Sequence, residues 1–279
     1  MFAFVNNQFI EESKATLGIT DLSIHRGYGV FDFFRTSNFI PFFLDHHLNR
    51  FFKSASLLRL QPTHSKEEIK EIIGELIRQN KVSDSGFKMI LTGGYSPDGY
   101  ELSSPNFIIV QQALQMSDKQ KFDKGINIIL HEYMREMPEA KSINYLMGVY
   151  LQEKVKQQKA DDVLYYKEDA ILEFPRSNVF AVTKDQVVIT PAKNVLHGIT
   201  RMKVLELARK KYRVEERAVT VEELKNAAEV FLTNTTKRIL PVLAVDNKTI
   251  ESGKPGEVTT ALYQSFLKME SCLVATPTN

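Results

Sequence analysis

The chain has 279 residues, of which 43% are hydrophobic and 25% charged, values typical of a globular protein rather than of a disordered or fibrous one. Its 36 Lys and Arg residues nearly balance its 34 Asp and Glu residues, so no excess positive charge is available to bind nucleic acid. The single cysteine, Cys272, excludes a disulfide framework within the chain and a multi-cysteine zinc site, which favours a reducing cytoplasm. No apolar run approaches the roughly 18 residues of a membrane span, and the first residues lack the pattern of a secretory signal. We therefore expect neither nucleic acid nor a membrane as partner, and no metal site.

The first half of the chain alternates short strands with two helices. Strand segments are recognised by alternating hydrophobicity, and the helices by apolar residues at helical spacing. Ser65 and Glu68 form a capping box, which predicts the start of the second helix. In chain order we predict strands at 2–10, 29–36 and 39–43, helices from 45 and from 66, and strands at 87–91 and 107–110. The glycines and proline of residues 93–99 predict a loop between the last two strands.

A polar stretch, residues 115–124, is the best candidate for a domain linker. We therefore expect a smaller first domain at 1–114 and a larger second domain at 125–279. In the second domain we predict strands at 126–130, 163–166, 179–182, 187–190, 230–232 and 242–245, and helices at 145–158, 201–211 and about 258–269. Because strands and helices are mixed without a regular βαβ rhythm, the pattern favours an α+β fold with largely antiparallel sheet.

Lys141 is the first candidate for chemistry. It follows a turn that contains Arg135 and Pro138 and precedes an apolar helix, a position from which an amine can point into a crevice. A lysine whose pKa is lowered can form an imine with an aldehyde cofactor. A lone lysine is more often a surface residue, so spacing alone leaves both interpretations open.

Two segments have the chemistry of a phosphate site. Gly198, Ile199 and Thr200 stand at the start of a predicted helix, whose first N–H groups have no intrahelical partner and lie at the positive end of the helix dipole. Thr235 and Thr236 follow a predicted strand and supply hydroxyl donors. An ordinary helix cap and a polar turn are the alternatives for these two segments.

Two charged residues complete the set of candidates. Arg50 lies on the helix that begins near residue 45 and could bind a phosphate bidentately, although a helical arginine is more often solvated. Glu173 stands between apolar residues at a strand end. Beside a pyridine ring its carboxylate would keep the ring nitrogen protonated. An edge-strand glutamate that faces water is the alternative.

Together and in this order, these features resemble the fold type IV pyridoxal-phosphate family, the class IV aminotransferases. This family includes branched-chain aminotransferases, D-amino-acid aminotransferases and aminodeoxychorismate lyases. The matching segments span nearly the whole chain, and they are HLNR at 47–50, KSINYL at 141–146, Glu173 with SNVF at 177–180, GITR at 198–201, and EVF at 229–231. The resemblance implies a two-domain α+β fold like that of D-amino-acid aminotransferase, in which the larger second domain binds pyridoxal 5'-phosphate. It also implies a homodimer with the active site between the two domains.

The resemblance also implies a role for each candidate residue. Lys141 would be the catalytic Schiff-base lysine and proton shuttle, and Glu173 the partner of the pyridine nitrogen. Tyr145 resembles the tyrosine that binds the phenolic oxygen of the cofactor in branched-chain enzymes, and a buried structural tyrosine is the alternative. The residues that resemble the family's phosphate contacts are Arg50, Gly198, Ile199, Thr200, Thr235 and Thr236. The expected activity moves an amino group between an amino acid and a 2-oxo acid.

Substrate selection is expected to depend on the first domain. Phe31 resembles the aromatic lining of branched-chain aminotransferases, which favours an apolar side-chain pocket. Tyr95 and Tyr100, in the loop that begins at residue 93, are further substrate-binding candidates. Leu91-Thr92-Gly93-Gly94 stands where D-amino-acid aminotransferases have a strand ending in Thr-Arg-Gly. The arginine that would bind the substrate carboxylate is therefore absent, which argues against D-amino-acid specificity.

Two further cations are candidates for substrate binding, and two activities other than amino-group transfer are to be considered. Arg135, six residues before Lys141, is predicted by its position to replace the missing carboxylate-binding arginine. Lys88 resembles a lysine near the substrate in aminodeoxychorismate lyases, so a lyase that forms 4-aminobenzoate and pyruvate is the alternative activity. A cofactor-binding scaffold without turnover is disfavoured, because the chain retains both Lys141 and Glu173.

Overall fold

The computed structural model describes residues 1–114, 116 and 119–275. The described residues separate into two units. Unit 1 contains residues 1–114 and 140–144, and unit 2 contains residue 116, residues 119–139 and residues 145–275.

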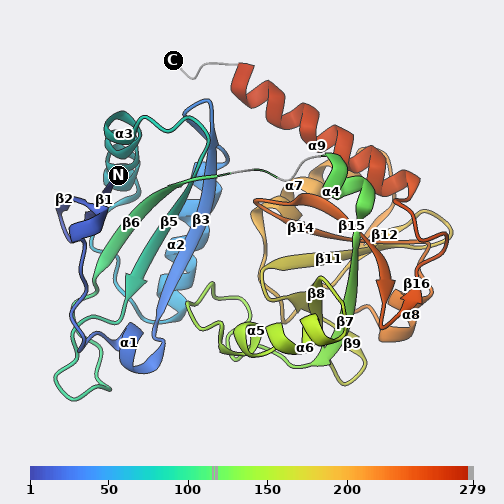
Figure 1. Ribbon diagram of the computed structural model, residues 1–279, viewed down its shortest axis with the longest axis horizontal. Helices are drawn as coiled ribbons and strands as arrows, with labels where there is room; N and C mark the ends of the chain where they lie inside the picture. The colour runs from blue at the N-terminus through green and yellow to red at the C-terminus, as the bar shows by residue number, and fades with distance from the viewer. Residues whose placement is uncertain (115, 117–118, 276–279) are drawn as a thin grey trace. The chain divides into compact units, whose positions relative to one another are not determined.

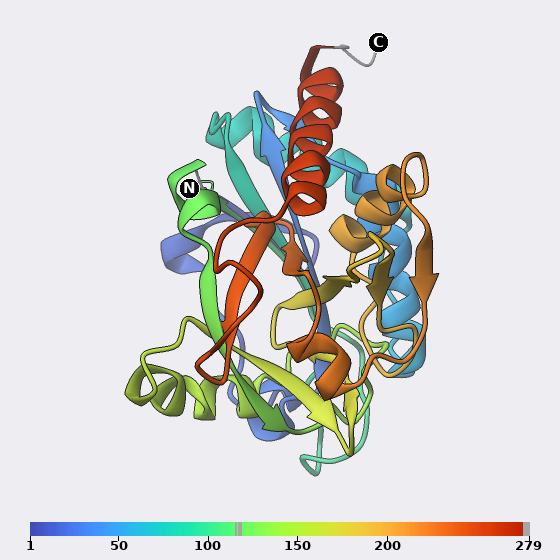
Figure 2. The same cartoon turned by 90° about the vertical axis from the view of Figure 1, so that its right-hand side faces the viewer.

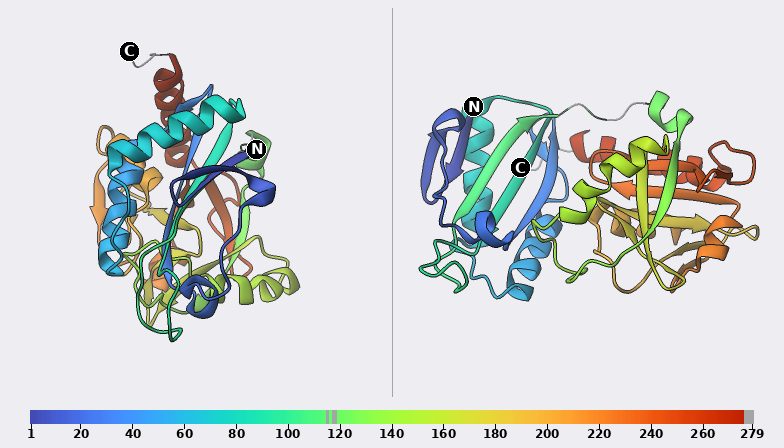
Figure 3. Two further views of the ribbon diagram at one scale, coloured as in Figure 1. Left: turned by 90° about the vertical axis from the view of Figure 1, so that its left-hand side faces the viewer. Right: turned by 60° about the horizontal axis from the view of Figure 1, so that its bottom comes forward.

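Unit 1 is a six-stranded sheet with the strand order β2-β1-β6-β5-β3-β4, and every neighbouring pair is antiparallel. The strands are β1 (Phe2–Val5), β2 (Gln8–Glu11), β3 (Gly29–Ser37), β4 (Ile40–Pro41), β5 (Ser85–Thr92) and β6 (Phe107–Ala113). The helices are the 3-10 turn η1 (Glu12–Lys14), α1 (Leu22–Arg26), α2 (Leu44–Leu57) and α3 (Lys66–Asn80). Helices α2 and α3 cover the same face of the sheet (Figures 1 and 3).

The core of unit 1 lies between its sheet and these two helices. Phe34 of β3 and Phe87 of β5 are fully buried and stack with ring centroids 5.0 Å apart. Because side chains alternate along a strand, the neighbours of Phe34 in β3 point to the opposite face, away from α2 and α3. The predicted capping box is confirmed, since Ser65 and Glu68 each bind the main chain of the other.

Unit 2 is a ten-stranded sheet that curls (Figure 1), with the main strand order β13-β12-β11-β14-β15-β7-β8-β9. The strands are β7 (Ile126–Glu132), β8 (Asp162–Lys167), β9 (Ala170–Ile171), β10 (Glu173–Phe174), β11 (Ser177–Val182), β12 (Val188–Thr190), β13 (Val214–Glu216), β14 (Glu229–Asn234), β15 (Arg238–Val245) and β16 (Lys248–Thr249). Most pairs are antiparallel, and the parallel pairs are β12 with β13, β15 with β7, and β7 with β8. The largely antiparallel α+β fold predicted from the sequence is therefore confirmed.

The helices of unit 2 lie against the faces and ends of this sheet. They are α4 (Lys119–Lys124), α5 (Leu146–Tyr150), α6 (Gln152–Gln157), α7 (Ile199–Ala208), α8 (Val221–Lys225) and α9 (Glu257–Ala275). The long helix α9 packs against α7, β14 and β15 (Figure 2). Phe180 of β11 and Phe231 of β14 are fully buried on the sheet and stack with ring centroids 4.9 Å apart. Within the described ranges, no helix is both long enough and apolar enough to cross a bilayer.

The structure differs from the sequence predictions in several local details. The strand predicted at 39–43 is reduced to Ile40–Pro41, because Phe39 and Phe43 have φ angles of 66° and 55°, in the left-handed region. The helix predicted at 145–158 is divided at Leu151 into α5 and α6.

The two units differ from the predicted domains in residues 119–124 and 140–144. Of the predicted linker, residues 115, 117 and 118 lie outside the described residues, and residues 119–124 form α4 of unit 2. Phe122 of α4 is buried and stacks on Tyr263, with ring centroids 4.1 Å apart, so this stretch packs as part of unit 2. Residues 140–144, predicted to belong to the second domain, are part of unit 1.

Candidate active site

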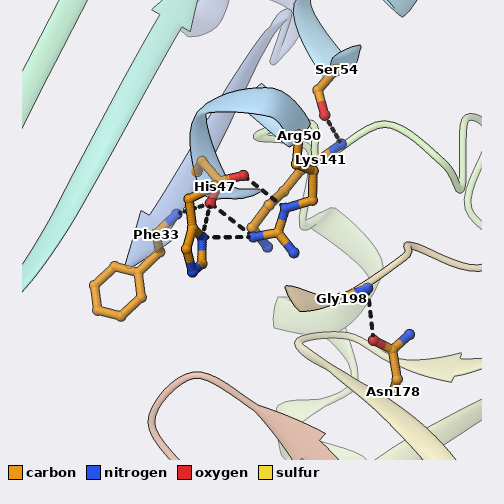
Figure 4. Close-up of polar contacts among 8 residues, drawn as sticks. Phe33, His47, Arg50, Ser54, Lys141, Asn178 and Gly198 are labelled. Carbon is orange, nitrogen blue, oxygen red and sulfur yellow. Dashed lines mark hydrogen bonds and ion pairs between the residues drawn. The ribbon is translucent and has the colours of Figure 1, made fainter. Parts of the chain in front are cut away.

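The main chain around Lys141 is fixed to unit 1 on two sides. Its carbonyl accepts the N–H of Phe31 in β3 at 2.9 Å, and Ser142 forms a bridge with Val30. On the other side, the hydroxyl of Ser54 in α2 accepts the N–H of Lys141 at 3.0 Å (Figure 4). Residues 141–143 therefore run beside β3 like a short extra strand, and this pairing explains why they belong to unit 1.

The side chain of Lys141 lies over an aromatic ring. Its Nζ is 4.4 Å from the centroid of Phe31, within the range of a cation–π contact. Phe31 pairs with Ile90 of β5, and the next residue on the same face, Phe33, pairs with Lys88. The amine therefore stands on a sheet face that is apolar at Phe31 and Ile90 and that also carries the cations Lys88 and Arg35.

Arg50 is held by a buried carboxylate of the same unit. Its Nε and Nη2 donate to the two oxygens of Asp32, each at 2.8 Å, and Asp32 is fully buried. Asp32 also accepts from Nδ1 of His47 at 2.8 Å and from the main-chain N–H of Phe33 at 2.7 Å (Figure 4). His47 and Arg50 come from the same face of α2, because they are three residues apart. A bidentate pair of this kind fixes the plane and direction of the guanidinium.

The charges in this cluster follow from burial and neighbours. Burial alone would raise the pKa of Asp32, but Arg50 and His47 outweigh it and hold that pKa well below its usual range. Burial lowers the pKa of His47 more than its hydrogen bond to Asp32 raises it, and the cations Arg50 and Lys141 lower it further. At neutral pH Asp32 is therefore ionised and His47 neutral.

In unit 2, Glu173 at the start of β10 is held by an ion pair and by a main-chain hydrogen bond. One carboxylate oxygen accepts from Arg135 through Nε at 2.8 Å and Nη2 at 2.6 Å. The other oxygen accepts the main-chain N–H of Leu196 at 2.9 Å, and the Glu173 residue is only 5% exposed. Arg135 also donates to the carbonyl of Pro138. The guanidinium that the sequence suggested for the substrate carboxylate is thus in direct contact with Glu173.

Asn178 fixes the loop that leads into α7. Its Nδ2 donates to the carbonyl of Leu196 at 2.7 Å. Its Oδ1 accepts the N–H of Gly198 at 3.2 Å, as Figure 4 shows. Asn178 pairs with Glu173 across the β10–β11 hairpin. A Cβ at Gly198 would lie 2.2 Å from Oδ1 of Asn178, so this close approach requires glycine. One hairpin therefore positions both Glu173 and the start of α7.

Helix α7 begins at Ile199 with Gly198 as its N-cap, and no side chain caps it among the described residues. The N–H groups of its first turn, including those of Ile199 and Thr200, have no acceptor within the helix. Such a helix start binds an anion well, because the helix dipole adds positive potential there.

Thr235 and Thr236 form the turn between β14 and β15, beside the same hairpin. Asn234, the last residue of β14, donates to the hydroxyl of Ser177 at 2.8 Å and accepts the N–H of Thr236 at 3.1 Å. The hydroxyl of Thr233 is buried beside Asn178 in the ladder and has no hydrogen-bond partner in the described structure. The structure thus brings Glu173, Gly198–Thr200 and Thr235–Thr236 together within unit 2.

The remaining predicted residues lie in three separate places. Lys88 is half-buried on β5 of unit 1, opposite Phe33. Tyr95 and Tyr100 lie in the loop between β5 and β6 and are 43% and 81% exposed. The Tyr95 hydroxyl accepts the N–H of Gly18 at 3.2 Å. Tyr145 is the N-cap residue of α5 in unit 2.

The loop that carries these tyrosines is anchored by a buried acid that the sequence analysis missed. Asp21 is fully buried and accepts from the hydroxyl of Thr92 at 2.6 Å and from the side-chain amide of Asn106 at 2.7 Å. It also caps α1 by accepting the N–H of Ser23. Asp21 therefore joins both ends of the loop to α1.

Comparison with known proteins identifies the family. Residues 29–245 match the family model described as amino-transferase class IV. The chain belongs to the class IV aminotransferases. This aminotransferase is 32% identical over 277 residues to a D-alanine aminotransferase of Bacillus licheniformis, a match that covers 96% of this chain and 98% of the relative. It is 29% identical to a D-alanine aminotransferase of Staphylococcus haemolyticus, with 95% and 96% covered.

Solved structures of the same fold agree with this assignment. A branched-chain amino acid aminotransferase of T.th., solved with pyridoxamine 5'-phosphate, gives a TM-score of 0.89 at 25% identity and covers 96% of this chain and 93% of that one. A branched-chain aminotransferase of Escherichia coli gives a TM-score of 0.90 at 24% identity, with 96% and 94% covered, and shows the fold alone. The predicted fold, the pyridoxal-phosphate dependence and the transfer of an amino group between an amino acid and a 2-oxo acid are confirmed.

The residues present fit such a cofactor. Pyridoxal phosphate needs an amine for its aldehyde, a carboxylate for its ring nitrogen and donors for its phosphate. Unit 1 supplies the Lys141 amine and an immobilised Arg50. Unit 2 supplies an ion-paired carboxylate and, as far as the described residues show, a helix start without a side-chain cap and a Thr233 hydroxyl without a partner.

Proposed function

We propose that this aminotransferase acts on amino acids with apolar side chains. The observation that carries this proposal is the contact between Lys141 and Phe31, because Lys141, proposed here as the reacting amine, lies over a ring of the sheet face that Phe31, Phe33 and Ile90 share. An apolar face favours an apolar side chain and disfavours a charged one, which would lose its hydration there. The D-alanine and branched-chain aminotransferases that the chain resembles are named for substrates of this apolar class.

We propose that one molecule of pyridoxal phosphate is bound by the residues assigned above. Lys141 would hold the aldehyde carbon of the cofactor through its amine, and the same amine would move the proton at the substrate α-carbon. Glu173 would hold the proton on the pyridine nitrogen, and the bound cofactor would thereby supply an electron sink for the substrate α-carbon. The phosphate-binding set is Arg50, the N–H groups of Ile199 and Thr200 after Gly198, and the hydroxyls of Thr235 and Thr236. Tyr145 is proposed for the phenolic oxygen.

The substrate carboxylate is assigned to Lys88 in this proposal. Lys88 lies on the sheet face that carries Phe31, one same-face residue pair along the strands from it, whereas Arg35 on that face is buried and lies over the ring of Phe42. Diagonal neighbours in a sheet lie about 7–8 Å apart, within reach of a long side chain. The exposed Tyr95 and Tyr100 are proposed to contact the substrate from the loop.

A donor and acceptor screen tests this proposal. We expect kcat/KM for D- or L-alanine or leucine, with pyruvate or 2-oxoglutarate as acceptor, to exceed that for aspartate or lysine of the same configuration by at least about 10-fold. Phe31→Ala is expected to lower the leucine-to-alanine ratio of kcat/KM, while the control Phe39→Ala, on an exposed turn, leaves it unchanged. A preference for charged donors contradicts the proposal. Faster formation of 4-aminobenzoate and pyruvate from aminodeoxychorismate would establish the lyase alternative.

We also propose that the enzyme is a homodimer in which α5 contributes to the interface. Leu146, Val149 and Tyr150 of this short helix are 76%, 69% and 74% exposed. Adjacent exposed apolar side chains commonly mark a protein interface. Sedimentation should give twice the mass of the chain, and Val149→Glu should give monomers, whereas the control Lys156→Glu on the neighbouring helix should not. A monomeric wild-type protein contradicts this proposal.

We place the enzyme in the cytoplasm. The sequence has one cysteine, so it cannot form the intrachain disulfides that are common in oxidising compartments. Cell fractionation with an antibody to the chain tests this location, and recovery outside the cytoplasmic fraction contradicts it.

A further inference from the structure

Arg135 and Glu173 form an ion pair that the roles proposed above leave unexplained. The two side chains are 13% and 7% exposed, and both Nε and Nη2 of Arg135 contact the same carboxylate oxygen. The residues are 38 positions apart in the chain, so their contact is a product of the fold. The N–H of Leu196 donates to the other oxygen, so both oxygens of the carboxylate accept hydrogen bonds.

This geometry has two physical consequences for Glu173. First, a buried carboxylate without a cation tends to take up a proton, whereas an adjacent guanidinium favours the ionised form. Second, donors on both oxygens fix the plane of the carboxylate, which one hydrogen bond alone would leave free to rotate. The planar, permanently charged guanidinium is well suited to both tasks.

The same contacts disfavour Arg135 as the main ligand of a substrate carboxylate. Two of its donor nitrogens bind Glu173, and Nη2 also donates to the carbonyl of Pro138. A substrate carboxylate that bound through Nε and Nη2 would have to displace Glu173, and a buried charge would then lose its partner.

We propose that Arg135 is a positioning residue that keeps Glu173 ionised and oriented toward the pyridine nitrogen of the cofactor. This inference rests on the role proposed above for Glu173. It predicts that Arg135 acts on catalysis only through Glu173, and that substrate affinity does not depend on it directly.

The experiment uses a double-mutant cycle in the holoenzyme. The variants are Arg135→Gln, Arg135→Lys, Glu173→Gln and the double variant Arg135→Gln/Glu173→Gln. The control is Arg213→Gln, which removes a 77% exposed arginine of the same unit from its pair with Glu215. Three quantities are measured for each: the pH dependence of the visible absorption of the cofactor, kcat, and KM for the amino donor. Circular dichroism establishes that each variant is folded.

We expect Arg135→Gln to lower kcat roughly 10- to 100-fold, as when an outer partner that orients a ligating residue is removed, with KM changed less than about 3-fold. The pH midpoint of the cofactor band should shift in the same direction in Arg135→Gln and Glu173→Gln, and no further in the double variant. Arg135→Lys should recover part of the loss, because it keeps the charge without the planar fork.

Two results would overturn the inference while leaving the proposed function intact. One is a raised KM in Arg135→Gln with kcat and the cofactor band unchanged, which would indicate substrate binding. The other is a double variant whose losses multiply, which would indicate that Arg135 and Glu173 act independently. If the wild-type enzyme and Arg213→Gln both transaminate but Glu173→Gln retains full activity and an unchanged band, the proposed role of Glu173 fails, and this inference fails with it.

Discussion

In unit 1 the candidate cofactor residues are two long cationic side chains, Arg50 and Lys141, whereas in unit 2 they are mainly N–H groups and hydroxyls at the ends of helices and strands. A flexible cation needs a partner to hold it, and unit 1 provides the buried carboxylate of Asp32 for Arg50 and main-chain pairing for Lys141. An N–H group is already rigid, and it needs only a loop in the correct place. In unit 2 the side chain of Asn178 holds this loop by hydrogen bonds to the main chain on both sides of His197.

This difference teaches where each unit is vulnerable. Removing a charge should damage unit 1 most, because a cation left in a buried site has lost its counter-ion. An added methyl group should weaken cofactor binding most in unit 2, because the N–H donors there are positioned by close packing of a side chain on the main chain. Each prediction below tests one side of this comparison.

The largest effect is expected from Asp32→Asn in unit 1. The change keeps the shape of the side chain but removes the only charge that faces Arg50 in the Asp32–His47–Arg50 cluster. Breaking a buried ion pair in this way costs about 3–5 kcal/mol. Urea unfolding at pH 7 measures the loss. Asp45→Asn, which affects an exposed pair with Lys70, is the matched control and should change little. If the two variants lost the same free energy of unfolding, the buried ion pair would stabilise the fold no more than the exposed one does.

The next effect is expected from Gly198→Ala in unit 2. The added methyl group would lie 2.2 Å from Oδ1 of Asn178, so the loop or Asn178 must move. Such overpacking costs about 1–3 kcal/mol. The displaced donors should weaken binding of pyridoxal phosphate more than that of pyridoxal, which lacks the phosphate.

A glycine in open space provides the control for this prediction. A Cβ at Gly74 in α3 meets nothing within 4 Å, so Gly74→Ala should leave both affinities unchanged. Equal weakening of both ligands by Gly198→Ala would refute a role in phosphate binding.

A smaller effect is expected from Ser54→Ala. The hydroxyl of Ser54 accepts the N–H of Lys141, and both lie in unit 1. Loss of one such hydrogen bond costs about 1 kcal/mol. Ser56→Ala, at an exposed position of the same helix, is the control for thermal unfolding. Identical melting temperatures for the two variants would indicate that the hydrogen bond contributes nothing.

The smallest effect concerns His47 and depends on pH. Because the pKa of His47 is lowered in the folded protein, the unfolded chain binds more protons than the folded one between that lowered value and about 6.5. The stabilising contribution is therefore complete above about pH 6.5 and decreases as the pH falls below it. His47→Asn, which retains a donor near the place of Nδ1, should lose less melting temperature than the wild type between pH 7.5 and 5.5. Parallel losses would contradict the assignment of a neutral, buried His47.

Local signals in the sequence were enough to predict many elements. The capping box of Ser65 and Glu68 fixed the start of α3, since it depends on residues three apart. The strand predicted at 39–43 failed because Phe39, in the turn between β3 and β4, and Phe43, in the turn into α2, have left-handed φ angles that are unusual for phenylalanine.

In the candidate site, too, local sequence signals predicted only part of what the structure shows. Sequence motifs predicted the candidate residues themselves, but the side chains that hold these residues in place come from distant parts of the chain. Ser54 reaches Lys141 across 87 residues, and Arg135 reaches Glu173 across 38. Asp32 and His47 did leave a signal, namely an acid within an aromatic strand and a histidine three residues before Arg50 on the same helix. That signal becomes specific only when the packing of α2 on β3 is known.

The covalent attachment of the cofactor to Lys141 is the central claim, and it can be tested directly. The holoenzyme is reduced with borohydride and digested, and the modified peptide is identified by mass spectrometry. The account predicts a phosphopyridoxyl group on the peptide that contains Lys141, and none in Lys141→Ala. A modification on another lysine, such as Lys88, or no modification in a protein that binds the cofactor, would contradict it.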